Sequence, residues 1–329
     1  MSEYSILILL QDHNTITFVK KRILITGGAG FIGSHLCDFF IDKGYAVVCL
    51  DIGDTDRVKH LLTNKEFIFI KHDVSEPITF NDRLDYVLHF ASPARFLDYI
   101  KNPVRTVKSS SFGTYNVLIL ARRKKARFLL ASTDGVYGDP LEHPQKESYT
   151  GNVNPVAQRS VYDEAKRFAE TMTMAYCHKE KVNTGIARIF YTYGERMHIH
   201  EGRVVPVFII AALKNRPITL LGNGRHVRSF CYIGDLVEGI YKLMKSDMHY
   251  PINLGSPRGT SILELAYLIK ELTKSKSNIV LKKDMPIEDP KARVPDITLA
   301  KSKLKWKPRV SLEEGLLTTI NYYKNNLDR

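Results

Sequence analysis

A glycine-rich turn near the start of the chain constrains its fold more than any other segment. The spaced glycines of the turn are Gly27, Gly30 and Gly33. The apolar run 23–25 leads into the turn, and a helical pattern of apolar residues follows it. A strand, a glycine turn and a helix in this order are typical of a dinucleotide-binding βαβ unit.

Each glycine has its own predicted role in that unit. Gly27 permits the tight turn, Gly30 lets the backbone approach a pyrophosphate, and Gly33 lets the helix pack close to the strand. The helical pattern that follows has Ile32 on its apolar face, and the first N–H groups and positive dipole end of this helix point at the phosphates.

A second apolar run, residues 45–50, ends in Asp51. A carboxylate at this place accepts both hydroxyls of an adenosine ribose and repels a 2′-phosphate. The predicted cofactor is therefore NAD rather than NADP.

Strand and helix patterns alternate from residue 21 to about residue 190. This alternation predicts an α/β fold with a Rossmann-type, doubly wound parallel sheet and right-handed helical crossovers. The predicted strands are 22–26, 46–51, 67–72, 86–90, 127–132 and 184–190. The clearest amphipathic helices between them are 104–122 and 161–178.

After residue 190 prolines interrupt the pattern, which predicts a smaller, irregular α/β lobe for the substrate. The expected division is a NAD-binding domain at 21–190 with a returning segment at 229–256, and a substrate lobe at 191–228 and 257–329. Residues 1–20 are a leader, either an added strand or a disordered segment. A last helix, 312–323, has a capping box of Ser311 and Glu314.

The net charge of +13 raises the question of nucleic-acid binding. The lysines are scattered, and the densest basic runs, 122–125 and 301–307, lack the interleaved aromatics of a stacking platform. A solvated basic face that attracts a doubly charged nucleotide is the favoured interpretation, and no nucleic-acid partner is expected.

No apolar run in the sequence approaches the length of a membrane span, so we expect no membrane partner. The four cysteines are far apart and form no Cys-x-x-Cys pair, which predicts neither a metal site nor a disulfide framework. A reducing cytoplasm is the expected compartment.

Two further motifs contain the candidate catalytic residues. Tyr162 and Lys166 are four residues apart on a predicted helix, so both side chains lie on one face. A lysine ammonium and a cationic nicotinamide ring both lower the pKa of a tyrosine hydroxyl, which then acts as a general base on a sugar hydroxyl. Ser132 and Thr133 end the fifth strand, at the edge where parallel sheets bind ligands.

These motifs lie in a chain that resembles the extended short-chain dehydrogenase/reductases, and within them the UDP-glucuronate decarboxylases. The resemblance covers about residues 21–320 and is most specific at 127–133, 137–145, 151–155, 159–164, 235–239 and 295–301. It implies NAD as cofactor, a UDP-hexuronate or related nucleotide sugar as substrate, oxidation of C4, loss of carbon dioxide and re-reduction of the ketone.

The resemblance also assigns residues. It implies that Thr133, Tyr162 and Lys166 carry the redox step. The implied cofactor contacts are Gly27, Gly30, Phe31, Ile32, Gly33, Asp51, Asp73, Val74, Phe90, Ala91, Tyr162 and Lys166. The implied substrate contacts are Arg159, Tyr191, Arg203, Arg228 and Arg293. Helices 104–122 and 161–178 resemble those of a homodimer interface, although Val117, Leu120, Phe168 and Met172 fit a monomer core equally well.

The residues expected to contact the substrate differ from the family pattern. Where the family has Ser-Glu after the strand-end threonine, this chain has Asp134-Gly135. The family glutamate is needed for efficient decarboxylation, and Asp134 is the candidate catalytic carboxylate that remains. A 4-epimerase or C4 dehydrogenase therefore stays an alternative to the decarboxylase. Weaker alternatives are a 4,6-dehydratase and a non-catalytic NAD-bound binding protein.

Overall fold

The structure of the chain, a computed structural model, describes residues 20–158, 160–198, 202–282 and 289–326. Nearly all of the predicted leader, residues 1–19, lies outside this part. A seven-stranded sheet forms the larger body, in the order β11-β6-β5-β4-β1-β2-β3. Its strands are β1 (Arg22–Thr26), β2 (Ala46–Asp51), β3 (Phe67–Lys71), β4 (Tyr86–His89), β5 (Arg127–Thr133), β6 (Thr184–Ile189) and β11 (Pro251–Leu254).

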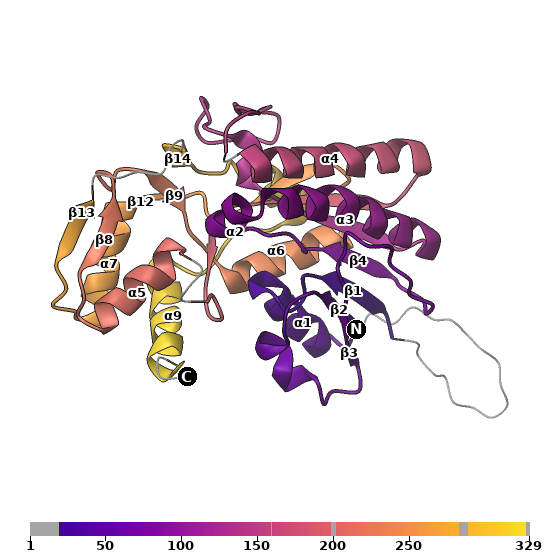
Figure 1. Cartoon of the computed structure of the whole chain (residues 1–329), viewed down its shortest axis with the longest axis horizontal. Coiled ribbons are helices and arrows are strands. Elements are labelled where there is room, and N and C mark those ends of the chain that lie inside the picture. Colours follow the sequence, from indigo (N-terminus) through magenta and orange to yellow (C-terminus); the bar gives the residue numbers. More distant parts are fainter. Residues whose placement is uncertain (1–19, 159, 199–201, 283–288, 327–329) are drawn as a thin grey trace.

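All strand pairs of this sheet are parallel, which confirms the predicted fold class. Helices α3 (Pro103–Lys124) and α4 (Ser160–Glu180) cover one face, and α1 (Phe31–Asp42) and α6 (Ile233–Lys245) cover the other (Figure 1). The predicted strands and helices differ from these by three residues or fewer at each end. Parallel crossovers bring the carboxyl ends of β1, β4 and β5 to one edge, where ligands bind.

A smaller lobe lies beyond this edge (Figure 1). Its core joins α5 (Val204–Leu213), α7 (Ile262–Thr273) and α9 (Leu312–Asn326) with β8 (Ile218–Leu221), which pairs with β13 (Ile279–Lys282). Short strands β9 (Val227–Ser229), β12 (Gly259–Ser261) and β14 (Ala292–Arg293) form a second sheet. Strands β7 (Thr192–Tyr193) and β10 (Cys231–Tyr232) pair with each other in parallel.

Helix α8 (Thr298–Leu304) differs from the expected division of the chain. It was expected in the substrate lobe, but Ala300, Leu304 and the following Trp306 are buried in the same apolar core as α1 and α6. The indole Nε1 of Trp306 donates a 2.9 Å hydrogen bond to the carbonyl of Asp235 on α6. The predicted capping box of α9 is present, since Ser311 and Glu314 bond each other's backbone N–H groups.

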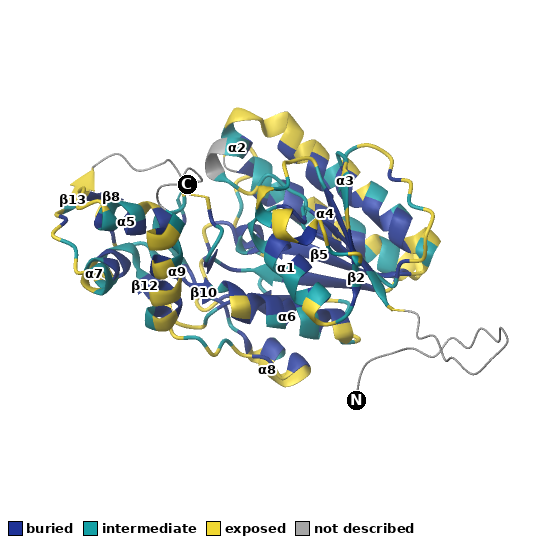
Figure 2. Cartoon of the chain, turned by 90° about the horizontal axis from the view of Figure 1, so that it is seen from below, coloured by how far each residue is buried: buried dark blue, intermediate teal, exposed yellow. Residues whose placement is uncertain are grey.

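The outer faces of α3 and α4 are exposed, while the sheet beneath them is buried (Figure 2). Val117 and Leu120 lie in the monomer core, so they are not part of an external face. Phe168 on α4 is 49% exposed and Phe112 on α3 is 57% exposed. None of the described helices is long and apolar enough to span a bilayer.

Candidate active site

A cavity of about 970 Å³ lies at the carboxyl edge of the sheet and extends into the smaller lobe. It is lined by all four predicted catalytic residues, Thr133, Asp134, Tyr162 and Lys166. A second cavity of about 320 Å³ adjoins it and shares the walls formed by Gly27, Gly30 and Phe90. Every predicted cofactor residue lines one of these two cavities.

The glycine turn has the geometry that a dinucleotide phosphate requires. Gly27 has φ +70°, a conformation that favours glycine, and Cβ atoms on Gly27 or Gly33 would clash with the neighbouring backbone. A Cβ on Gly30 would meet only the carbonyl of Gly27, at 3.1 Å, so the approach to this residue is open. The start of α1 lies beside this opening, as an anion site needs.

The smaller cavity fits the adenosine end of the same cofactor. Asp51, Asp73, Val74 and Ala91 all line it. The Asp51 carboxylate accepts hydrogen bonds from the N–H groups of Ala29, at 2.9 Å, and Gly53, at 2.8 Å. These two bonds fix the carboxylate at the end of β2, and its oxygens keep further lone pairs for ribose hydroxyls.

Tyr162, Thr133 and Asp134 meet at the end of β5. A hydrogen bond joins the hydroxyls of Tyr162 and Thr133. Thr133 Oγ1 also donates to Asp134 Oδ1 and accepts from the N–H of Gly135, both at 3.1 Å. Ser132, the other predicted hydroxyl, instead donates to Glu170 at 2.5 Å. Thr133 is therefore the strand-end hydroxyl that contacts the tyrosine.

Lys166 lies one helical turn from Tyr162, as the spacing predicts. Its Nζ is 5.9 Å from the centre of the Tyr162 ring and donates to the carbonyl of Ala131 at 2.9 Å. Burial lowers the pKa of Lys166 to about 8, and the Glu170 carboxylate opposes this shift. The ammonium is thus held under the tyrosine by the end of β5.

The pKa of Tyr162 itself moves opposite to the predicted direction. Burial raises it well above the ordinary value, while the hydrogen bond with Thr133 and the charge of Arg203 act to lower it. Desolvation of a phenolate outweighs these effects in the protein alone. Tyr99 adds to this enclosure, since its ring stacks on that of Tyr162 with 5.4 Å between the centroids.

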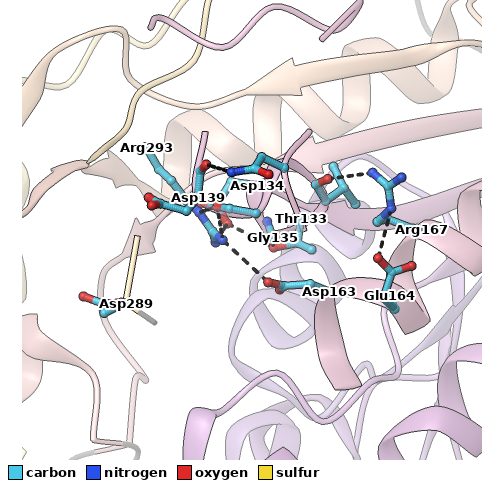
Figure 3. Close-up of polar contacts among 12 residues, drawn as sticks. Thr133, Asp134, Gly135, Asp139, Asp163, Glu164, Arg167, Asp289 and Arg293 are labelled. Atoms are coloured by element: carbon cyan, nitrogen blue, oxygen red, sulfur yellow. Dashed lines mark hydrogen bonds and ion pairs between the residues drawn. The ribbon is translucent and has the colours of Figure 1, made fainter. Parts of the chain in front are cut away.

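Arg293 joins the two carboxylates that flank the strand end (Figure 3). Its Nη1 lies 3.5 Å from Asp134 Oδ1, and its Nη2 lies 3.6 Å from Asp163 Oδ2. The guanidinium also donates to the carbonyl of Gly138, at 2.7 Å from Nη2. The Asp163 carboxylate occupies the space into which a side chain on Gly135 would project.

A buried ion pair holds helix α4 against the sheet. Arg188 on β6 donates to both oxygens of Glu170, at 3.0 and 2.8 Å. The same guanidinium donates to the hydroxyl of Tyr137 at 3.0 Å. Glu170 lies one turn after Lys166, so this pair fixes the position of the helix that carries Tyr162 and Lys166.

The smaller lobe contributes the far wall of the cavity. Four of the predicted substrate residues line it, namely Tyr191, Arg203, Arg228 and Arg293, whereas Arg159 lies outside the described residues. Arg228 Nη2 contacts Asp289 Oδ2 at 2.8 Å, and His226 Nδ1 contacts the same oxygen at 2.9 Å. The positive charges of Arg203, Arg228 and Arg293 suit the binding of a nucleotide diphosphate.

Sequence reasoning missed three residues of the segment after β4. Ser92 and Arg95 line both cavities, and Tyr99 lines the larger one. The rule that ligands bind at the carboxyl ends of parallel strands points to this segment, since it follows β4 directly. In the described part of the chain, no three His, Cys, Asp or Glu side chains are grouped to hold a metal ion.

Comparison with known proteins identifies relatives along almost the whole chain. The family model described as GDP-mannose 4,6 dehydratase matches residues 24–319. UDP-glucuronic acid decarboxylase 1 of Danio rerio is 48% identical over 312 residues, which cover 94% of this chain and 74% of that protein. Its namesake in Arabidopsis thaliana is 47% identical over 94% of this chain and 71% of that protein.

Solved structures agree on the fold. UDP-glucose 4-epimerase of Thermotoga maritima superposes with a TM-score of 0.86 at 29% identity, covering 93% of this chain and 100% of the other. UDP-glucuronic acid 4-epimerase of Bacillus cereus, in complex with UDP-glucuronic acid and NAD, gives a TM-score of 0.82 at 27% identity, with coverage of 93% and 99%. The chain therefore belongs to the GDP-mannose 4,6 dehydratase family of NAD-dependent epimerases and dehydratases, within the extended short-chain dehydrogenase/reductases.

Proposed function

We propose that the protein is an NAD-dependent enzyme that oxidises C4 of a nucleotide sugar and decarboxylates a UDP-hexuronate. The observation that carries this proposal is the contact of Tyr162 with Thr133 above Lys166, in a cavity that reaches from the glycine turn to the arginines of the substrate lobe. The similarity to UDP-glucuronic acid decarboxylases over 94% of the chain supports the same reaction.

In the proposed reaction, each group of residues has a separate role. The glycine turn and Asp51 hold NAD, which accepts hydride from C4 when bound. Thr133 and Tyr162 bind the C4 hydroxyl and remove its proton. Lys166 contributes positive charge beneath the tyrosine. Arg203 and Arg228 bind the diphosphate, and Arg293 lies where it can reach the sugar carboxylate.

A second candidate, a 4-epimerase, is favoured by one observation. Gly135 offers no carboxylate beside Thr133, and epimerisation needs only the redox residues and NAD. The structural similarity to two 4-epimerases is in line with this alternative.

One experiment separates the candidates. Purified protein is incubated with UDP-glucuronate, and the products are followed by mass. Loss of carbon dioxide supports decarboxylation. An unchanged mass with a new stereochemistry at C4 supports the epimerase. No reaction with UDP-glucuronate, UDP-glucose or UDP-galactose contradicts both.

We further propose a homodimer and a reducing, cytoplasmic location. Val104, Phe112 and Tyr115 on α3 and Phe168 on α4 are all at least 44% exposed, and together they would give a two-fold interface an apolar centre. All four cysteines are free thiols. Light scattering coupled to size exclusion tests the dimer, and Phe112→Glu with Phe168→Glu is expected to yield monomers.

A further inference from the structure

A second tyrosine packs against the ring of Tyr162. Tyr99 lies on α2 (Phe96–Lys101), a short helix beside α3 and α4 (Figure 1). This residue is 5% exposed and lines the larger cavity. The centroids of the Tyr99 and Tyr162 rings are 5.4 Å apart, and the ring planes are 12° from parallel. This geometry is that of an offset stack, one of the arrangements that aromatic pairs prefer.

Helix α2 is held in place at both of its ends. At its start, the N–H of Tyr99 donates to the carbonyl of Arg95 at 3.2 Å, and the Arg95 guanidinium forms an ion pair with Asp98. At its end, the N–H of Asn102 donates to the carbonyl of Asp98 at 2.8 Å, directly before α3 begins. Tyr99 therefore reaches Tyr162 from a backbone that is fixed by its own hydrogen bonds.

Tyr162 needs support from outside its own helix. It lies in the first turn of α4, where backbone N–H groups lack partners within the helix and the helix frays most easily. The Lys166 ammonium, from the next turn of α4, lies 5.9 Å from the centre of the ring. The terminal torsion of a tyrosine side chain is soft, so a flat neighbour determines how the ring is turned. Tyr99 is such a neighbour, and it comes from a separate element.

We propose that Tyr99 is a positioning residue for Tyr162, and that the stack of the two rings aims the Tyr162 hydroxyl at the sugar hydroxyl that is oxidised. This inference rests on the proposed function. Tyr99 neither gives nor takes a proton, so the role depends on its ring and not on its hydroxyl. The stack also keeps water away from one face of Tyr162. A misplacement of the reacting group by about 1 Å can cost about 100-fold in rate.

The test compares two replacements of Tyr99. Tyr99→Phe keeps the ring, and Tyr99→Leu keeps an apolar side chain without a flat face. The measured quantities are kcat and KM for UDP-glucuronate, or for UDP-glucose or UDP-galactose where only these react. Tyr99→Leu is expected to lower kcat about 10- to 100-fold and to leave KM within about three-fold of the wild type, because positioning acts in the transition state. Tyr99→Phe is expected to retain most of the wild-type kcat.

The dependence of kcat on pH gives a readout that a merely structural role would not move. In the described part of the chain, the charged groups that act on Tyr162 are Lys166, Arg203, Asp163 and Asp134. All of them remain when Tyr99 is replaced. Burial, the largest effect, raises the pKa of Tyr162 well above its ordinary value. Water that reaches the uncovered ring face should lower this pKa, so the rise of kcat with pH should move to lower pH in Tyr99→Leu and stay in place in Tyr99→Phe.

The matched control is Tyr241→Leu, which removes an aromatic contact elsewhere in the same body. Tyr241 on α6 packs against Phe39 on α1, with 5.3 Å between the ring centroids, and it lines neither of the two cavities. This variant is expected to keep the wild-type kcat and pH profile. The affinity of every variant for UDP, measured by calorimetry, is expected to be unchanged, which shows that each one is folded.

The outcomes separate the positioning role from the proposed function. A wild-type kcat in Tyr99→Leu would overturn the role, because the stack would then be dispensable. Equal losses of kcat in Tyr99→Phe and Tyr99→Leu would overturn it too, because the hydroxyl rather than the ring would then matter. In both cases the proposed function stands. If the wild type converts none of UDP-glucuronate, UDP-glucose and UDP-galactose, the proposed function itself fails, and the positioning role fails with it.

Discussion

The carboxylate of Asp163 fills the space beside Gly135, so that a Cβ atom on residue 135 would clash with Asp163 Oδ1. The same Cβ would lie 3.1 Å from Cγ2 of Thr133. Beside Gly135 the chain has one aspartate next to it in sequence, Asp134, and a second, Asp163, that occupies the space a side chain would take. The two carboxylates share Arg293.

Gly135→Ala should therefore destabilise the fold by about 1–3 kcal/mol, the usual cost of overpacking. The reason is that the new methyl group displaces Asp163 from Arg293. Chemical denaturation measures the change. Asp163→Ala removes the atom that clashes, so the double variant should lose less stability than the sum of the two single variants. Strictly additive losses would contradict this packing.

The ion pair of Glu170 and Arg188 is expected to be a major support of helix α4. Both side chains are almost buried, with exposed fractions of 11% and 12%. Glu170→Ala should cost about 3–5 kcal/mol in free energy of unfolding, because it leaves a buried guanidinium without its carboxylate. Glu180→Ala, which breaks an exposed pair with Arg122, should cost less than about 1 kcal/mol. Equal losses in the two variants would show that burial is not the cause.

Lys166 should make stability depend on pH. Its pKa is about 8 in the fold, against an ordinary value of 10.5, so the unfolded chain binds more protons between these values. The free energy of unfolding of the wild type, minus that of Lys166→Met, should therefore rise with pH from 8 to 10.5, by up to about 3 kcal/mol. Denaturation at a series of pH values measures this difference. A flat difference would mean that the ammonium is solvated rather than buried.

Asp51 should determine the preference of the protein for NAD over NADP. Asp51→Asn removes the negative charge and keeps the shape, so NAD affinity should fall about 10- to 100-fold through weaker bonds to the ribose. Affinity for NADP should fall less or rise, because the repulsion of its 2′-phosphate is lost. Calorimetry on cofactor-free protein gives both constants. If the ratio of NAD affinity to NADP affinity does not change, the adenosine ribose does not contact Asp51.

The cofactor half of the molecule could be predicted from the sequence because its signals are local. The glycine turn, the apolar strands and the Tyr162–Lys166 spacing each depend on residues close together in the chain. Strand limits were predicted within a residue, and the capping box of α9 was identified from Ser311 and Glu314. Backbone geometry and helical periodicity dictate these features directly.

The order of residues along the chain is enough to predict the fold class, the parallel sheet and the edge that carries the cavity. Which side chains meet at that edge depends on how distant segments pack together. Arg293 lies 159 residues after Asp134, and Tyr99 reaches Tyr162 from a separate helix. The same packing raises the pKa of Tyr162 through burial and places Asp163 in the space beside Gly135. Desolvation and packing depend on the atoms that surround a group from distant segments, and no local pattern in a single chain records them.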